Sequence, residues 1–335
     1  MARLLRDAHI PRSRRLIEFV LLVVAVGIGS FSMYLIDPET AWDMGKNPWI
    51  QGTVVLGVCA LIAHLVLQFR ARYADPFILP LVVALNGIGL AMIFRIDKDP
   101  AMQKSPVGES QLFWTGFSMI LSVVLYFLRD HRVLRKITYI SLVLSFILLI
   151  MPLIPGLGTE INGARIWIRL GGRTFQPGEI AKITLAIFFA GYLSTHRDLI
   201  LTAGKRLGPI NLPRLRDLTP IFLAWMVSIG VLVFQKDLGS AILFFGLFMA
   251  MLYLSTGKIS WLVVGGVGVV VGGYFAYNSI SHVHARIYGW MHAFDPEVYM
   301  SSSGGSGQIL QGIFGLSYGG LFGRGWGQGR TSLVP

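Results

Sequence analysis

Long runs of apolar residues, separated by short polar segments, dominate this chain. A helix needs about 20 residues to cross the hydrocarbon core of a bilayer. By that measure the pattern predicts about nine membrane-spanning helices, with ends uncertain by a few residues. They are Leu16–Ile36, Ile50–Phe69, Phe77–Ile96, Leu112–Leu128, Ile137–Ile154, Gly178–Ser194, Leu218–Phe234, Ser240–Leu254 and Trp261–Ile280. The predicted fold class is therefore all-α, a polytopic integral membrane helical bundle.

Two of the polar segments are long, and both fall on the predicted outer side. One runs from Pro155 to Pro177, and the other runs from His282 to Pro335. The second segment is rich in glycine, which disfavours one continuous helix. Within it, Ile309–Leu316 has the pattern of a short amphipathic helix lying on the membrane.

Composition supports a membrane protein. Of the 335 residues 54% are hydrophobic and only 14% are charged, with a mean hydropathy of +0.63. Soluble domains carry roughly 25% charged residues, so lipid must be part of the solvent of this chain. The single cysteine, Cys59, lies in an apolar run and excludes a disulfide, a zinc site of several cysteines and a redox pair.

The net charge of +12 would suggest nucleic acid in a soluble protein. Here the basic residues mostly flank apolar runs, so they indicate topology and contact with anionic membrane lipids, and we expect no nucleic-acid partner. A modest majority of Lys and Arg falls on the side of the N-terminus, which predicts a cytoplasmic N-terminus. The apolar run from Leu16 is too long for a cleavable signal peptide, so we expect it to remain as an anchor.

Several cations lie on the outer side, against this trend. Four of them occur between Arg165 and Lys182, and Arg324 and Arg330 follow in the C-terminal segment. They are either loop charges without a partner or the binding groups for an anionic ligand at the outer surface.

The segment from Asn162 to Lys182 fits either reading. Pro177 suits the first turn of a helix, and Gln176 then lies near the N-cap. Glu179 and Lys182 fall one turn apart on one face. A helix N-terminus beside cations attracts anions. The alternative is an ion pair at a helix start with arginines reaching into the interface.

The segment from Gln235 to Ser240 forms a tight outer turn between two predicted spans. Asp237 has two readings. It either caps the helix that follows or holds an acidic group at the outer surface near the first segment.

The segment from Trp290 to Glu297 supplies two acids, Asp295 and Glu297, to the last outer segment. A carboxylate there is a candidate general base, although Asp-Pro is also a common turn starter. His282 and the nearby His284 and His292 form a loose cluster without an acid or cysteine at a familiar spacing, so no metal site is predicted.

These motifs together resemble the shape, elongation, division and sporulation family, whose best-known members are RodA and FtsW. The family patterns Gly-Ala-Arg-x-Trp-Ile and Phe-Gln-Pro-x-Glu-x-Ala-Lys match Gly163–Ile168 and Phe175–Lys182, and Gln-x-Asp-Leu-Gly matches Gln235–Gly239. The Gly-rich loop patterns match Gln308–Gln311 and Gly319–Gly325.

The resemblance covers residues 77–335, a transmembrane core ending in a large outer loop. Residues 1–76 would add a cytoplasmic tail and two extra helices, as in the RodA-like proteins of actinobacteria. Family members normally continue past Pro335 with three more helices.

The resemblance implies a glycosyltransferase that polymerises lipid II into peptidoglycan glycan strands at the outer face of the bacterial cytoplasmic membrane. Its partner would be a class B penicillin-binding protein, and the extra helices favour a role in cell elongation and shape. Asp295 is the nearest match to the essential acid of the family, with Glu297 as the alternative.

Substrate contacts also follow from the resemblance. Arg165, Arg173 and Lys182 would bind the pyrophosphate of lipid II, with Glu179 orienting Lys182. A divalent cation, Mg²⁺ or Mn²⁺, would assist the leaving group. The other predicted substrate-binding residues are Gln176, Asp237, Gln308 and Gln311.

Two other functions fit many of the same residues. A flippase for the lipid-linked precursor needs the same pyrophosphate-binding cations, but it also needs ionisable groups near the membrane midplane, in which these spans are poor. A scaffold that recruits the penicillin-binding protein is the second alternative.

Overall fold

The computed structural model describes residues 14–36, 48–98, 107–125, 127, 131–161, 164–170, 172–202, 205–207, 210–212, 215–301 and 305–325. Asn162, Gly163 and Arg330 lie outside these ranges. Contacts divide the chain into two compact units, residues 1–129 with 307–335, and residues 130–306. This division differs from the predicted boundary at residue 77, which rests on family resemblance and stays a prediction.

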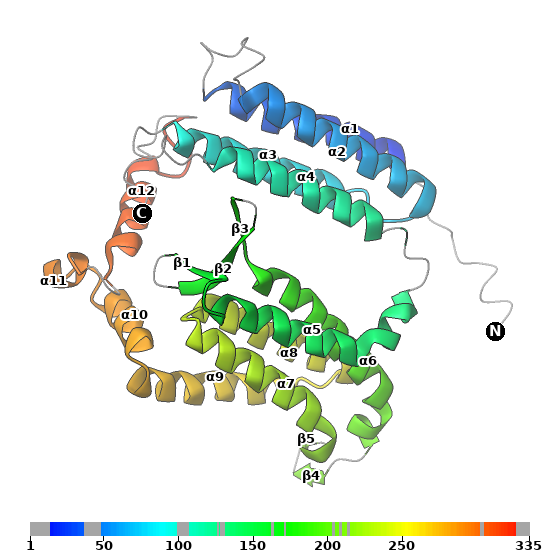
Figure 1. Ribbon diagram of the computed structural model, residues 1–335, viewed down its shortest axis with the longest axis vertical. Coiled ribbons are helices and arrows are strands. Elements are labelled where there is room, and N and C mark those ends of the chain that lie inside the picture. Colours follow the sequence, from blue (N-terminus) through cyan, green and yellow to red (C-terminus); the bar gives the residue numbers. More distant parts are fainter. Residues whose placement is uncertain are drawn as a thin grey trace, which may run out of the picture. The chain divides into compact units, whose positions relative to one another are not determined.

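The first unit contains α1 (Arg15–Tyr34), α2 (Pro48–Arg70), α3 (Ile78–Asp97), α4 (Gly108–Leu125) and α12 (Gly307–Gly319) (Figure 1). Buried positions of α1 recur every three or four residues, at Leu22, Ala25 and Gly29 among others. This spacing places them on one face, which packs mainly against α3.

Two glycines allow α1 and α3 to cross at backbone distance. A Cβ atom added to Gly29 would lie 2.8 Å from Cα of Gly87, and one added to Gly87 would lie 2.7 Å from Cα of Gly29. Any side chain at either position would separate the helices. Small residues commonly allow close contact between membrane helices in this way.

The second unit is built on five long helices with one continuous core. They are α5 (Thr138–Ile150), α6 (Pro177–Thr202), α7 (Leu215–Phe234), α8 (Leu238–Thr256) and α9 (Ser260–Ser279). The 3₁₀ turns η1 (His131–Ile137) and η2 (Met151–Leu153) flank α5. The fully buried rings of Phe188, Phe189 and Phe244 lie at the centre of the core.

A small antiparallel sheet follows η2, in the order β1 (Gly158–Ile161), β2 (Ala164–Leu170), β3 (Arg173–Phe175). Gly172, in the short turn between β2 and β3, has φ of +80°, which glycine adopts without strain. A two-stranded ribbon, β4 (Lys205–Leu207) and β5 (Ile210–Leu212), lies between α6 and α7.

Two short helices follow α9 in the second unit. They are α10 (Ser281–Met291) and α11 (Pro296–Tyr299) (Figure 1). In the second long outer segment, α12 contains the predicted helix Ile309–Leu316.

The polytopic helical membrane fold predicted from the sequence is confirmed. In the described part of the chain, six helices are long and apolar enough to cross a membrane: α1, α2, α3, the segment Arg132–Leu153 around α5, α8 and α9. The other three predicted spans coincide with α4, α6 and α7. The part of α7 from Thr219 to Phe234 is a shorter apolar helix. Residues 126 and 128, in the predicted fourth span, are outside the described ranges.

Two features differ from the expected pattern. α6 extends to Thr202, beyond the predicted end at Ser194. The prediction followed the apolar run alone, whereas the helix continues into the polar residues after it. The sheet β1–β3 was not predicted, since only the apolar runs were assigned a structure.

Candidate functional site

The start of α6 has the predicted geometry. Pro177 is its first residue, and the backbone carbonyl of Gln176 accepts a hydrogen bond from the Glu179 N–H at 3.1 Å. Lys182 Nζ donates to the Glu179 carboxylate at 2.8 Å. This i,i+3 pair holds the ammonium within the first two turns, where a helix N-terminus favours an anion.

The arginines of the hairpin lie on two faces of the sheet. Leu170 pairs with Arg173 and Arg169 pairs with Thr174, and paired residues share a face. Side chains alternate along β2, so Arg165 and Arg169 lie on the face of Thr174, opposite to Arg173. Arg165 and Arg173 are each partly buried, and Arg169 is exposed. Their joint action on one ligand stays a prediction.

The sheet is held close to the helical bundle at both ends. β2 contacts α6 and η2. A Cβ atom on Gly158 would overlap the carbonyl oxygen of Pro152 in η2, so only glycine fits where β1 passes this turn. This close approach fixes the position of the cationic hairpin next to the α5 end.

The turn between α7 and α8 is also tied to α5. Gln235 is buried and donates from Nε2 to the Leu149 carbonyl at 2.6 Å. Lys236 has φ of +60°, and Asp237 Oδ1 accepts a hydrogen bond from the Ser240 N–H at 3.0 Å. The capping reading of Asp237 is therefore confirmed. Its predicted contact with substrate is a separate property, which stays a prediction.

Asp295 lies at the N-cap position of α11, directly before Pro296, so it does start a turn. Its side chain makes no capping hydrogen bond and is exposed, as is that of Glu297. The buried Ser306 closes the loop behind it: its hydroxyl donates to the Ala293 carbonyl at 2.6 Å and its N–H to the Val298 carbonyl at 3.2 Å. The loop therefore presents both carboxylates to solvent.

Gln308 and Gln311 lie one turn apart on α12, in the first unit. Gln308 is exposed and Gln311 is partly buried. The positions of these two residues relative to Asp295 stay a prediction.

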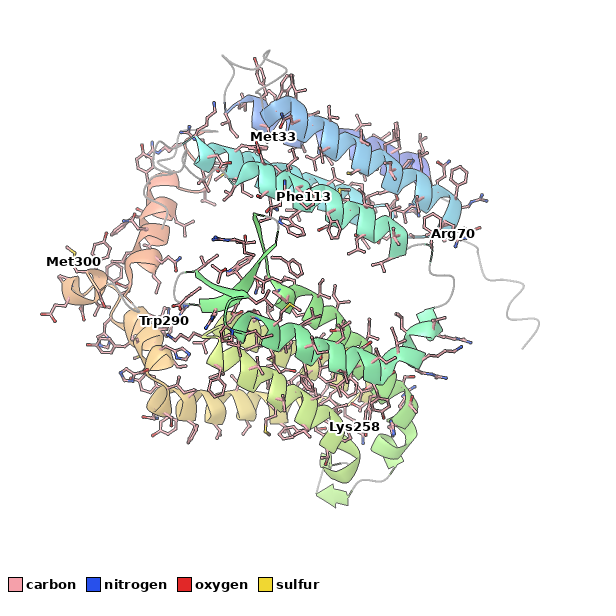
Figure 2. The ribbon with its side chains drawn as sticks, in the orientation of Figure 1. Met33, Arg70, Phe113, Lys258, Trp290 and Met300 are labelled. Atoms are coloured by element: carbon pink, nitrogen blue, oxygen red, sulfur yellow. The ribbon has the colours of Figure 1, made fainter. Side chains whose placement is uncertain are left out.

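Three of the predicted groups belong to one end of the second unit. If α5 to α9 cross the membrane in alternating directions, the end of α5, the start of α6, the α7–α8 turn and the end of α9 face the same side. The sheet, the Asp237 turn and the segment with Trp290 and Asp295 are attached at those points. Figure 2 labels Trp290 in this segment. Within the described residues, no three His, Cys, Asp or Glu side chains gather as metal ligands.

A buried polar network in the first unit was missed from the sequence. The Arg15 guanidinium pairs with the carboxylate of Glu18, which is fully buried, and His64 Nδ1 lies 2.7 Å from Glu18 Oε1. Arg15 also donates to the carbonyls of Ala71 at 2.8 Å and Ala74 at 2.7 Å. The signal was a lone acid inside an apolar run, which needs a partner in a membrane helix.

The hairpin was missed as well, although its signal was present. From Arg165 to Leu170, aliphatic residues alternate with residues that are polar or aromatic. Gly-Gly follows, which is a common hairpin turn.

Comparison with known proteins extends this picture. The sequence profile of the cell cycle protein family FtsW/RodA/SpoVE matches residues 76–335. The peptidoglycan glycosyltransferase RodA of Mycobacterium tuberculosis is 38% identical over 332 residues, which cover 96% of this chain and 69% of the relative. RodA of Mycobacterium leprae is 39% identical, over 82% of this chain and 58% of the relative.

Two more distant similarities are also found. A probable peptidoglycan glycosyltransferase FtsW of Trichlorobacter lovleyi is 28% identical, over 79% of this chain and 66% of the relative. A chain from a solved peptidoglycan synthase complex aligns with a TM-score of 0.48 and 20% identity, over 91% of this chain and 65% of that chain. By the profile match and the mycobacterial relatives, this chain belongs to the FtsW/RodA/SpoVE family of multi-pass membrane proteins.

Proposed function

We propose that this chain is a peptidoglycan glycosyltransferase, which polymerises lipid II into glycan strands during cell elongation. The observation that carries the proposal is the start of α6, where the Glu179–Lys182 pair at 2.8 Å follows a hairpin bearing Arg165 and Arg173. Relatives that are 38% and 39% identical to this chain are named peptidoglycan glycosyltransferases, which supports this activity.

The cationic group suits the leaving end of the donor. Lipid II carries a pyrophosphate, and the N-terminus of α6 with Lys182 beside it offers both backbone N–H groups and a positive charge. Glu179 keeps Lys182 at the helix start through their hydrogen bond. The arginines of the hairpin add charge around the same helix start, and Gln176 adds an amide one residue before it.

The acid–base step is assigned to Asp295. The acceptor sugar hydroxyl attacks the anomeric carbon of the donor and forms the new glycosidic bond, while the bond from that carbon to pyrophosphate breaks. The hydroxyl proton passes to the Asp295 carboxylate, and the lipid-linked pyrophosphate leaves with the bonding electron pair. The exposed position of Asp295 before Pro296 leaves room for both sugars.

A divalent cation is part of the proposal. Magnesium is commonly bound by one or two carboxylates together with phosphate oxygens, and the exposed Glu297 supplies one carboxylate of that kind beside Asp295. Bound there, Mg²⁺ or Mn²⁺ would neutralise charge on the pyrophosphate.

The setting follows from the same proposal. The N-terminus faces the cytoplasm, and the hairpin, the Asp237 turn, Asp295, Gln308 and Gln311 face the outer side of the bacterial cytoplasmic membrane. A class B penicillin-binding protein crosslinks the strands that this chain produces. The segment 1–76 is an addition in front of the family core.

Polymerisation of purified lipid II tests the proposal. The protein, with its penicillin-binding partner, should make glycan polymer, and Asp295→Asn should abolish it. Glu297→Gln tests the alternative acid, and Met300→Ala, at an exposed residue of the same loop without an assigned role, serves as the control. Full activity of Asp295→Asn would refute the acid assignment. No polymer from the unmodified protein, together with protein-dependent translocation of lipid II in vesicles, would favour the flippase instead.

A further inference from the structure

We propose that one face of α10 binds the growing sugar chain, through a row of stacked histidine and tyrosine rings that leads to Asp295. This inference rests on the proposed function, because it names a subsite for the polymeric product beside the proposed catalytic acid. The row consists of Tyr277 at the end of α9 and His284, Tyr288 and His292 along α10.

The four rings form one continuous stack. The centroids of Tyr277 and His284 are 4.5 Å apart with 26° between the planes, and those of Tyr288 and His292 are 4.2 Å apart at 24°. His284 and Tyr288 are 6.2 Å apart and nearly parallel, at 10°. The three later members recur every four residues, so the helix itself places them on one face.

The stack leaves the ring edges available to a ligand. His284 stacks one face on Tyr277 and Tyr288 stacks one face on His292, and His284, Tyr288 and His292 are exposed side chains. The edges carry imidazole nitrogens and a phenol oxygen, which can donate and accept hydrogen bonds. Nδ1 of His292 already lies 3.3 Å from the Tyr288 carbonyl oxygen, so this ring offers its Nε2. Stacking orders these edges before a ligand arrives, which lowers the entropy cost of binding.

The row is continuous with the proposed catalytic loop. α10 ends at Met291, and the Asp295 N–H donates to the carbonyl of His292 at 3.1 Å. The last ring of the row therefore belongs to the same turn that presents the Asp295 carboxylate. A product chain leaving Asp295 would meet these ring edges first.

The chemistry of the row favours a sugar chain over other ligands. A β-1,4-linked amino-sugar polymer presents hydroxyl and acetamido groups at regular intervals, and each can pair with an edge that donates and accepts. The row itself contains no carboxylate or guanidinium, so its selectivity would come from hydrogen bonds. The large apolar side chains of α10, such as Trp290, are outside the row and suit the membrane interface instead.

Binding of an uncharged probe tests this without any catalytic step. The whole chain in lipid nanodiscs is titrated with the dimer and the hexamer of β-1,4-linked N-acetylglucosamine. We expect the hexamer to bind more tightly than the dimer. The double variant His284→Phe/His292→Phe keeps the stack and loses the polar edges, and it should weaken hexamer binding by about tenfold.

Trp290→Ala is the matched control, since it removes a large exposed ring from the same helix outside the row. It should leave hexamer binding unchanged. Equal binding of the hexamer by the double variant and the unmodified chain would overturn the proposal. An equal loss of binding in Trp290→Ala would also overturn it, because it would indicate that α10 serves to contact the membrane interface. A chain that binds the hexamer through the row but makes no polymer would contradict the proposed function alone.

Discussion

The imidazole Nδ1 of His64 lies 2.7 Å from the carboxylate Oε1 of Glu18, and this contact joins α2 to α1 inside the first unit. Glu18 is fully buried and is also paired with Arg15. Arg15 in turn donates to backbone carbonyls of the segment after α2. One carboxylate therefore connects two helices and a loop.

Removing this carboxylate should destabilise the first unit strongly. Glu18→Ala leaves His64 and Arg15 without their buried partner, and breaking a buried pair in this way costs about 3–5 kcal/mol. Thermal unfolding in detergent measures the loss. Glu109→Ala, at an exposed position in the first turn of α4, should change stability by no more than about 0.5 kcal/mol. Equal midpoints for the two variants would mean that the network contributes nothing to stability.

The glycine contact between α1 and α3 gives a second test. Gly29→Leu or Gly87→Leu must push two backbones apart, at a cost of about 1–3 kcal/mol. Gly27→Leu and Gly89→Leu are matched controls two residues away, where an added Cβ meets nothing within 4 Å. Thermal unfolding in detergent should show a lower stability for Gly29→Leu and Gly87→Leu than for the two control variants. Similar stability in all four would contradict the close crossing.

The Glu179–Lys182 pair separates a structural role from a role in binding. Because the pair is partly exposed, it should add no more than about 1 kcal/mol to stability. Lys182→Ala should nevertheless reduce glycan polymerisation by at least about tenfold, since a cation beside pyrophosphate is lost. The exchange Glu179→Lys/Lys182→Glu restores an ion pair but moves the cation. Recovery of polymerisation in the exchanged protein would show that only the pair matters.

Asp237 caps α8, and its substitutions distinguish the cap from a charge needed by substrate. Asp237→Ala removes the acceptor for the Ser240 N–H and should cost about 1 kcal/mol. Asp237→Asn keeps an acceptor of similar capping strength and should keep the melting temperature. If polymerisation by Asp237→Asn falls about tenfold or more while its stability is kept, the negative charge contributes to the reaction. Unchanged polymerisation would assign Asp237 to the cap alone.

The helices could be predicted from the sequence because lipid makes the apolar run itself the signal. All nine predicted spans coincide with helices, and Pro177 begins α6 as expected. The Glu179–Lys182 pair and the Asp237 cap were also accessible, since both depend on residues three apart in one helix or turn.

Other features depend on contacts between distant segments, which spacing does not reveal. Arg15 directly precedes the first apolar run, yet it bonds to carbonyls more than fifty residues away. The faces of Arg165 and Arg173 depend on strand register, and the approach of Gly29 to Gly87 depends on how two helices cross. The ring row joins Tyr277 of α9 to the rings of α10, so it depends on how two helices meet and not on the pattern within one span.

The crossing of Gly29 with Gly87 also sets an order of assembly. α1 and α3 are the first and third of three consecutive candidate spans, so they run in the same direction through the bilayer. Their backbones can meet only after α2 has crossed back and α3 has left the insertion machinery. Until then α1 can pair with α2 through Glu18 and His64, but its Gly29 face remains exposed to lipid. The contact at Gly29 forms only when α3 is inserted.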